Sequence, residues 1–304
     1  MIPMLALAVV LVGTSSTFAQ VQVADCMSCH NDTTVITGKQ AGMSEAVHGT
    51  GESYVRGTSS SCAGCHSGGA FSAMVAAGLA PNEVEAGDPN PTRQDCRTCH
   101  QIHTGYTTAD WALETTAAVK LYAFEDLTYD GGKGNLCANC HQPRRMIAAP
   151  DADGNIAVTS THWGPHHGPQ GAMLLGKGGA GDVAGAPSFH YRLVGDTCVT
   201  CHIGPDMVHT FEAVESSCLD CHTEDEDLDG AQAAIAAQIA ELGELLMAKG
   251  LLDEEGHPVV GTYPAAQAAA LWNYILIEIE DGSLGAHNPP YTKALLDASI
   301  AAMQ

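Results

Sequence analysis

The sequence predicts a mainly α-helical fold with extensive loops, and three observations lead to this class. The motif Cys-x-x-Cys-His occurs six times, and the segments between its copies are rich in Gly, Pro, Ser and Thr. Aromatic residues make up 5% of the 304 residues while glycine occurs 33 times, so the side chains offer little material for a core. After residue 223, apolar residues recur at helical spacing. The part before it therefore needs another apolar component around which to fold.

The repeated motif uses all twelve cysteines of the chain. In chain order, sites 1 to 6 are Cys26, Cys29 and His30; Cys62, Cys65 and His66; Cys96, Cys99 and His100; Cys137, Cys140 and His141; Cys198, Cys201 and His202; and Cys218, Cys221 and His222. This is the attachment signature of c-type haem, in which both thiols form thioethers with the porphyrin and the adjacent imidazole binds the iron from one face. We therefore expect six covalently bound c-type haems, with the six motif histidines as proximal ligands.

Zinc ribbons, dithiol redox sites and a disulfide framework are the other interpretations of these cysteines. Zinc and dithiol sites do not need a histidine directly after the second cysteine each time. Bridges between cysteines three residues apart would staple distant segments poorly. Six porphyrins would also supply the missing apolar surface, so the sequence predicts a haem-packed multihaem cytochrome c fold, with an apo chain largely disordered over residues 25 to 223.

The chain is expected to have three segments: a signal peptide at 1–19, a haem domain at 20–223 and a C-terminal helical segment at 224–304. An apolar run over residues 4–12, followed by Thr17, Phe18 and Ala19, predicts a signal peptide at 1–19. Export would leave a soluble periplasmic or extracellular protein that starts near Gln20; an uncleaved membrane anchor is the alternative, for which the run is short. Residues 20–223 hold the six motifs and form the expected hexahaem domain.

Charge narrows the choice of partners. The chain has 12 Lys and Arg against 35 Asp and Glu, a formal net charge of −23. Such a negative field argues against nucleic acid or anionic lipid and favours docking to basic surfaces. We expect redox proteins, a donor and an acceptor, as partners.

The long gap between sites 4 and 5 contains a turn signal. Residues 151–155 predict a hairpin turn between strands at 146–148 and 156–158.

Residues 224–304 predict a C-terminal helical hairpin with a cap. An acidic run at 224–229 suits a helix N-terminus, and the helix over 231–249 would bury one apolar face. That face consists of Ile235, Ile239, Leu242, Leu245 and Leu246. A second helix is expected over 264–280 with Leu271, Trp272, Ile275 and Ile279 as its buried stripe, and a third over 291–303.

The second axial ligand decides whether a haem only carries electrons or also binds a substrate. Nine histidines lie outside the motifs: His48, His103, His162, His166, His167, His190, His209, His257 and His287. Six distal ligands can be drawn from nine, so bis-histidine ligation of every haem is arithmetically possible. Methionine ligation by Met43, Met74, Met173 or Met207 is then unnecessary, and packing is the simpler role for these side chains.

Several spare histidines have positions that suit a distal ligand. His103 follows His100 by three residues and cannot reach the opposite face of the same haem, so it would serve a neighbouring one. His48, His190 and His209 lie between motifs and are expected to be distal ligands.

The densest histidine cluster spans residues 162–167. At least one of its members should be a ligand; His167 is slightly preferred, His162 and His166 are held in reserve, and Trp163 is a candidate to pack on a porphyrin.

The linker between the last two expected helices carries Gly285, Ala286, His287, Asn288, Pro289, Pro290 and Tyr291. This Gly-x-His-Asn-Pro-x-Tyr element resembles one in the multihaem cytochromes related to cytochrome c nitrite reductase, where it supplies a distal haem ligand. The resemblance implies that His287 is a distal ligand. Nitrite reductases of that kind usually bind their catalytic haem through Cys-x-x-Cys-Lys, which this chain lacks, so electron-carrying relatives are the nearer comparison. His257 stands in a turn and is expected to face solvent.

Together these features predict an exported electron carrier with no catalytic residues of its own. Histidine at both axial positions keeps haem potentials low. Two alternatives stay open: a multihaem reductase of nitrite, hydroxylamine or a sulfur oxyanion with one open haem, and a homo-oligomer or subunit of an extracellular cytochrome filament.

Overall fold

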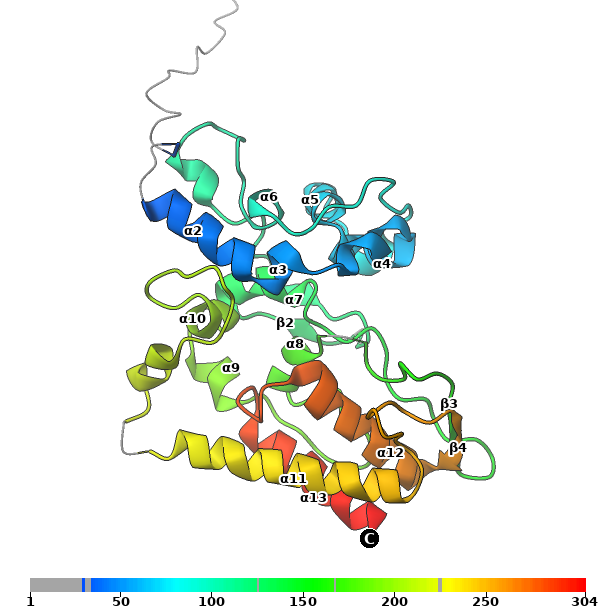
Figure 1. The fold of residues 1–304 in the computed structure, drawn as a ribbon. Coiled ribbons are helices and arrows are strands. Elements are labelled where there is room, and N and C mark those ends of the chain that lie inside the picture. The colour runs from blue at the N-terminus through cyan, green and yellow to red at the C-terminus, as the bar shows by residue number, and fades with distance from the viewer. Residues whose placement is uncertain (1–28, 31–33, 125, 167, 224–225) are drawn as a thin grey trace, which may run out of the picture.

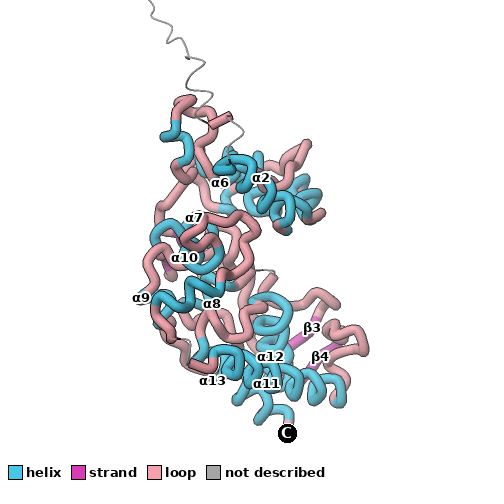
Figure 2. The backbone as a smooth tube through the Cα atoms, turned by 60° about the vertical axis from the view of Figure 1, so that its left-hand side comes forward, coloured by secondary structure: helices cyan, strands magenta, loops and turns pink. Residues whose placement is uncertain are grey.

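Short helices joined by long loops make up most of the molecule, as Figures 1 and 2 show. The computed structural model describes residues 29–30, 34–124, 126–166, 168–223 and 226–304. An upper part holds α2 to α6, a middle part holds α7 to α10, and α11 to α13 close the opposite end (Figure 1). The mainly α-helical fold predicted from the sequence is confirmed. The predicted signal peptide at 1–19 lies outside the described residues.

The upper part consists of helical pieces of 12 residues or fewer. Its elements are α2 Thr34–Glu45, α3 Val47–Thr50, η1 Ser53–Thr58, α4 Ser60–His66, α5 Gly68–Ala76, η2 Pro81–Glu83, α6 Cys96–Cys99 and η3 Thr108–Trp111. Polar residues start some of them: Asp95 accepts a 2.8 Å hydrogen bond from the Arg97 amide at the beginning of α6. A cap of this kind stabilises a one-turn helix, which the helix propensity of its residues alone would not stabilise.

The middle stretch of the chain has the same character and contributes three of the four strands of two small two-stranded sheets. Its elements are β1 Val119–Lys120, β2 Thr128–Tyr129, η4 Gly132–Gly134, α7 Asn135–Ala138, β3 Asn155–Val158, α8 Gln170–Leu174, α9 Phe189–Leu193, α10 Cys198–His202 and η5 Glu215–Asp220. The predicted hairpin is wrong in its pairing. The turn at 151–155 forms, but β3 pairs antiparallel with β4 Gly261–Pro264, and residues 146–148 form no strand.

The C-terminal helices match the predicted periodicity over most of their length. They are α11 Leu228–Ala248, α12 Ala265–Tyr274, the π-helix η6 Ile275–Asp281 and α13 Pro289–Met303. Leu271, Trp272 and Ile275 are buried as expected, whereas Ile279 is 53% exposed. The π-helical winding of η6 explains this difference, because i→i+5 hydrogen bonds rotate later residues away from the face that a 3.6-residue period predicts.

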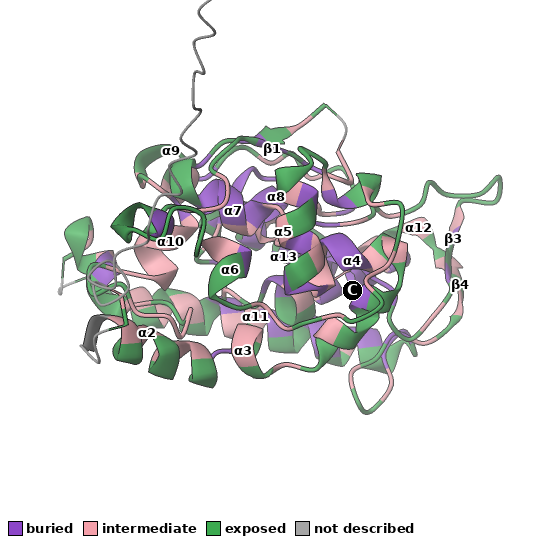
Figure 3. Ribbon diagram, turned by 90° about the horizontal axis from the view of Figure 1, so that it is seen from above, coloured by how far each residue is buried: buried purple, intermediate pink, exposed green. Residues whose placement is uncertain are grey.

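The apolar core is unevenly distributed, and most of it lies at the C-terminal end. One cluster joins α11, α12 and α13 to residues 156–180, while the two clusters around the motif sites are small. Figure 3 shows the buried segments in the centre of the molecule. Trp163, a candidate to pack on a porphyrin, belongs to the C-terminal cluster and packs against Trp272 at 5.1 Å between ring centres. None of the helices in the described part is long and apolar enough to cross a bilayer.

Replacing Trp272 by alanine is expected to destabilise the C-terminal part by about 3–5 kcal/mol. The side chain is 1% exposed, and its Nε1 donates a 2.8 Å hydrogen bond to the Gly178 carbonyl, so the change leaves a cavity and an unpaired acceptor. Guanidinium unfolding followed by far-UV circular dichroism measures the loss. The matched control, Ile279→Ala, removes an exposed apolar side chain of the next turn and should stay within about 0.5 kcal/mol; equal losses in both variants would contradict the expected core.

Candidate haem sites

The cysteines of sites 2 to 6 lie on or beside a short helical turn. Sites 2 to 6 involve α4, α6, α7, α10 and η5 in that order. Two cysteines three residues apart on one turn point to the same side, where both can reach one porphyrin edge. None of the cysteines from Cys62 to Cys221 takes part in a disulfide bond. Cys26 lies outside the described residues.

Each of the six motif histidines has a second histidine ring about 6 Å away. The pairs and their ring-centre distances are His30 and His103 at 6.1 Å, His66 and His166 at 6.3 Å, His100 and His209 at 6.3 Å, His141 and His48 at 5.9 Å, His202 and His287 at 6.3 Å, and His222 and His190 at 6.1 Å. No histidine appears in two of these pairs. The partners come from distant parts of the chain, so the fold brings the pairs together.

This spacing fits an iron ion between each pair. Histidine nitrogen binds transition metals at roughly 2 Å, which places the centres of two opposed imidazoles about 6 Å apart. Two imidazoles on opposite faces, with two thiols at the edge, are the donor set that a six-coordinate c-type haem requires. The residues present therefore fit the group that the motif predicts.

Hydrogen bonds at Nδ1 leave Nε2 available as the iron ligand in most of these rings. Backbone carbonyls can only accept, so the Nδ1 atoms that contact them donate. The carbonyl contacts are His100 to Trp111 at 2.7 Å, His190 to Ala286 at 2.6 Å, His202 to Phe211 at 2.9 Å and His209 to Met207 at 2.9 Å. A donated Nδ1 proton sets both the tautomer and the orientation of a ligating imidazole.

Three further histidines direct Nδ1 to a side chain. His141 contacts Gln170 Oε1 at 3.1 Å, and His222 contacts Glu226 Oε2 at 2.7 Å. His287 contacts Asp281 Oδ1 at 2.7 Å, and this carboxylate side chain is only 1% exposed. Burial lowers the pKa of His287 while the Asp281 carboxylate raises it, with a net upward shift.

Desolvation lowers the pKa of both histidines of the site 4 pair, His141 and His48. Burial, and after it the neighbouring His141, lowers the pKa of His48 to about 4. Burial also lowers the pKa of His141, against the hydrogen bond from its ring to Gln170. Both rings are therefore neutral at physiological pH, which is the form that binds a metal.

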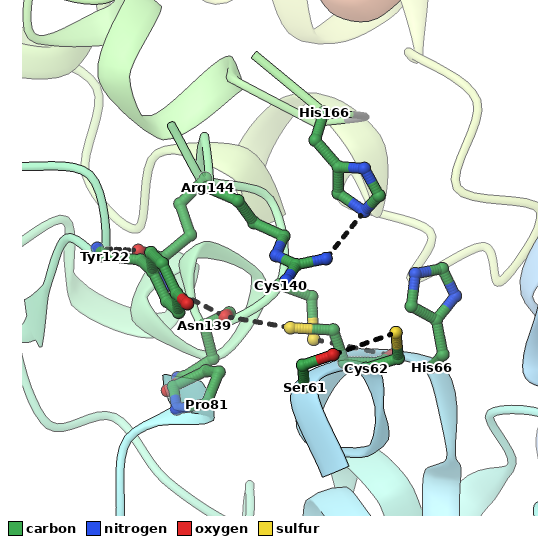
Figure 4. A pocket seen from close by; sticks show the side chains of 11 residues that line it. Ser61, Cys62, His66, Pro81, Tyr122, Asn139, Cys140, Arg144 and His166 are labelled. Atoms are coloured by element: carbon green, nitrogen blue, oxygen red, sulfur yellow. Dashed lines mark hydrogen bonds between the residues drawn. The ribbon is translucent and has the colours of Figure 1, made fainter. Parts of the chain in front are cut away.

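Figure 4 shows the pocket at site 2, where Cys62 and His66 lie near His166. Cys65 is a further lining residue of this pocket. The Arg144 guanidinium lies beside this pair, with Nη1 3.4 Å from His166 Nε2. His166 has a φ of +74°, a conformation that a non-glycine residue adopts only when its surroundings require it. Because iron needs Nε2, the guanidinium would have to release this nitrogen when the haem is held.

The structure thus brings five of the six preferred distal histidines opposite a motif ring: His48, His103, His190, His209 and His287. At site 2 the reserve residue His166 takes this place, and the preferred His167 lies outside the described residues. His162 and His257 are exposed.

The Gly-x-His-Asn-Pro-x-Tyr element positions His287 through the residues around it. Asn288 Nδ2 donates to the carbonyls of Met173 and Ala186, each at 3.0 Å. Tyr291 Oη accepts a 3.0 Å hydrogen bond from the Gly179 amide. These bonds fix the start of α13 against the middle part, so His287 projects toward His202.

Sequence reasoning missed the residues that hold the histidines. Asp281, Gln170, Glu226 and Arg144 each contact a paired ring, yet none belongs to a motif. The spacing of Glu226, four residues after His222, is the one local signal that could have indicated such a role.

Asp281→Asn is expected to raise the midpoint potential of a haem bound between His202 and His287 by about 60 mV, a tenfold change for one electron. A buried carboxylate that accepts the Nδ1 hydrogen bond makes Nε2 a stronger electron donor to iron, which favours the ferric state. The neutral amide of asparagine has a weaker effect, so the potential should rise. A spectroelectrochemical titration of the loaded protein measures it.

Glu226→Gln is the matched control for this change. Its carboxylate is 49% exposed, so solvent screens it and the shift should be smaller. Loss of haem from the Asp281→Asn protein, or equal shifts in both variants, would contradict an electronic role for Asp281.

Comparison with known proteins finds solved structures with a similar fold. No protein-family model and no curated protein matches the chain. The crystal structure of the outer cell wall cytochrome OcwA is similar, with a TM-score of 0.57 and 23% identity over 88% of this chain and 50% of OcwA. The undecahaem cytochrome from the S-layer of Carboxydothermus ferrireducens gives a TM-score of 0.48 and 19% identity over 80% of this chain and 38% of that one.

The likeness to OcwA concerns the fold. The chain has the fold of a multihaem cytochrome, as its motifs predict, and it spans about half the length of OcwA.

Proposed function

We propose that this protein is an exported electron carrier that holds six c-type haems, each bound by two histidines. The single observation that carries the proposal is that every motif histidine faces one other histidine at about 6 Å, with no ring shared. Haem iron at such a site takes up and releases single electrons. His103, His166, His209, His48, His287 and His190 are the distal ligands of sites 1 to 6 in that order.

The surrounding residues support conduction rather than catalysis. A histidine on each face leaves no coordination position for a substrate. Covalent attachment through the cysteines prevents loss of the cofactor, and the Nδ1 hydrogen bonds hold the rings in place. The rival function, a multihaem reductase, requires one site with a single axial histidine.

Location and partners follow from the fold likeness and the charge. OcwA is an outer cell wall cytochrome, and we place the present protein likewise outside the cytoplasm, with residues 1–19 as its signal peptide. Its donor and acceptor are redox proteins with basic docking surfaces, because residues 193–248, which surround sites 5 and 6, contain no lysine or arginine.

The test is to count the haems and determine the spin state of each iron. Mass spectrometry of the mature protein should show six added haems. Electron paramagnetic resonance and resonance Raman spectra should show only low-spin ferric iron. A stoichiometric high-spin signal would overturn pure conduction in favour of the reductase, and absence of added haem would overturn the whole proposal.

A further inference from the structure

Site 4 lies against site 2 through their cysteines. The Cys140 thiol is 3.9 Å from the Cys65 carbonyl oxygen, and the Cys65 thiol is 3.8 Å from the carbonyl of Asn139, the residue before Cys140. The Cys140 and Cys65 side chains also contact each other. The attachment edges of these two sites therefore meet, although 75 residues separate the cysteines.

Site 4 also lies against sites 3 and 5. Cys99 of site 3 and Cys140 of site 4 pack on the same apolar cluster of Phe71, Met74 and Leu136. On the other side, the Cys198 thiol of site 5 is 3.9 Å from the Gly134 carbonyl, just before α7. The Cys137 and Cys198 side chains also contact each other.

Phe211 joins the same three sites from the distal side. Its ring lies 4.7 Å from the His48 ring of site 4 and 5.8 Å from the His209 ring of site 3. Its carbonyl accepts the Nδ1 hydrogen bond of His202 in site 5. Phe211 has a φ of +62°, so the backbone is held in a disfavoured conformation at this junction.

Sites 1 and 6 extend the array at its two ends. His100 of site 3 and His103 of site 1 are three residues apart in one turn, which keeps these sites adjacent. Site 6 follows site 5, because the Val214 amide, beside η5, donates a 2.8 Å hydrogen bond to the Cys201 carbonyl. His30, His103 and Cys221 are exposed, as expected for end positions.

Resting on the proposed function, we infer that the six haem sites form a branched array and not a single row. Sites 1, 3, 4, 5 and 6 form the row, and site 2 branches from site 4. The array therefore has three ends, at sites 1, 2 and 6, and site 4 is the junction through which electrons from any end must pass. A carrier of this form can join two donors to one acceptor, or one donor to two acceptors.

The iron positions test the branch directly. A crystal of the haem-loaded protein, with anomalous diffraction recorded at the iron edge, should give six irons, with those of sites 2, 3 and 5 nearest to that of site 4. The branch is overturned if the iron of site 2 lies nearer to another iron than to that of site 4. Fewer than six irons, or an iron with one axial histidine, would instead count against the proposed function, so the two failures are distinguishable.

Deletion of single sites gives a second measurement. Removing the junction with Cys137→Ala/Cys140→Ala should split rapid reduction by a basic one-electron donor into separate phases. Removing the branch with Cys62→Ala/Cys65→Ala should leave the other five haems in one phase. Stopped-flow absorbance at the Soret band follows both, with haem content measured first. Equal behaviour of the two variants, each with five haems, would overturn the junction.

Discussion

Expressed without haem attachment, the chain is expected to lose its structure over residues 34–145 and to keep it over the C-terminal helices. The two halves differ in what fills their interior. The upper part contributes Phe71 and Met74 to one small cluster, which it shares with Leu136 of α7, whereas α11, α12 and α13 share a large cluster with Leu242, Leu271 and Leu295 fully buried. Porphyrins supply the apolar surface that the upper part lacks, so removing them removes its main source of stability.

Hydrogen exchange with mass spectrometry distinguishes the two halves in the full-length apo chain. Amides of α2 to α6 should exchange with an opening free energy near zero, and amides of α11 to α13 should be protected by a few kcal/mol. The haem-loaded protein is the control and should be protected in both. Equal protection of the two halves in the apo chain would show that the upper part does not depend on haem.

The attachment sites could be predicted from the sequence because a thioether-linked haem requires its cysteines and histidine to be contiguous. The C-terminal helices could be predicted for a similar reason, since apolar periodicity is local. Ile279 is the exception: apolar periodicity predicts that it is buried, but the chain changes to a π-helix in η6 and exposes it. That change depends on tertiary packing, which a local sequence period does not describe.

The assignment of distal ligands to sites could not be predicted. Counting spare histidines indicates that six are available, but the partner of His141 is 93 residues away in the chain, at His48, and that of His202 is 85 residues away, at His287. Only the three-dimensional fold decides such pairs. Neighbouring histidines are harder still, because side chains of adjacent residues point in different directions and one backbone turn decides which of them faces the haem.

The same argument separates the roles of two carboxylates of the C-terminal segment, Asp281 and Asp297. Asp281 is buried and directed at a paired imidazole, while Asp297 is exposed and forms an ion pair with Lys293 on the surface of α13. Burial and the partner, which sequence does not reveal, decide that only the first can tune a haem.

His166→Gly is expected to convert one haem of six to the high-spin form. Glycine accepts the positive φ at this position without strain, so the variant removes the imidazole and leaves the backbone in place. The site 2 iron would then keep only His66. Electron paramagnetic resonance should show a high-spin signal equal to about one sixth of the total iron, and added imidazole should restore the low-spin spectrum by filling the position.

The matched controls are His167→Gly and His162→Gly, which remove histidines of the same cluster. Both should leave every haem low-spin if His166 is the ligand of site 2. A high-spin signal in His167→Gly with none in His166→Gly would assign the iron to the neighbouring histidine. Unchanged spectra in all three variants would show that site 2 takes its second ligand from elsewhere, and the pairing of His66 with His166 would then be a packing contact alone.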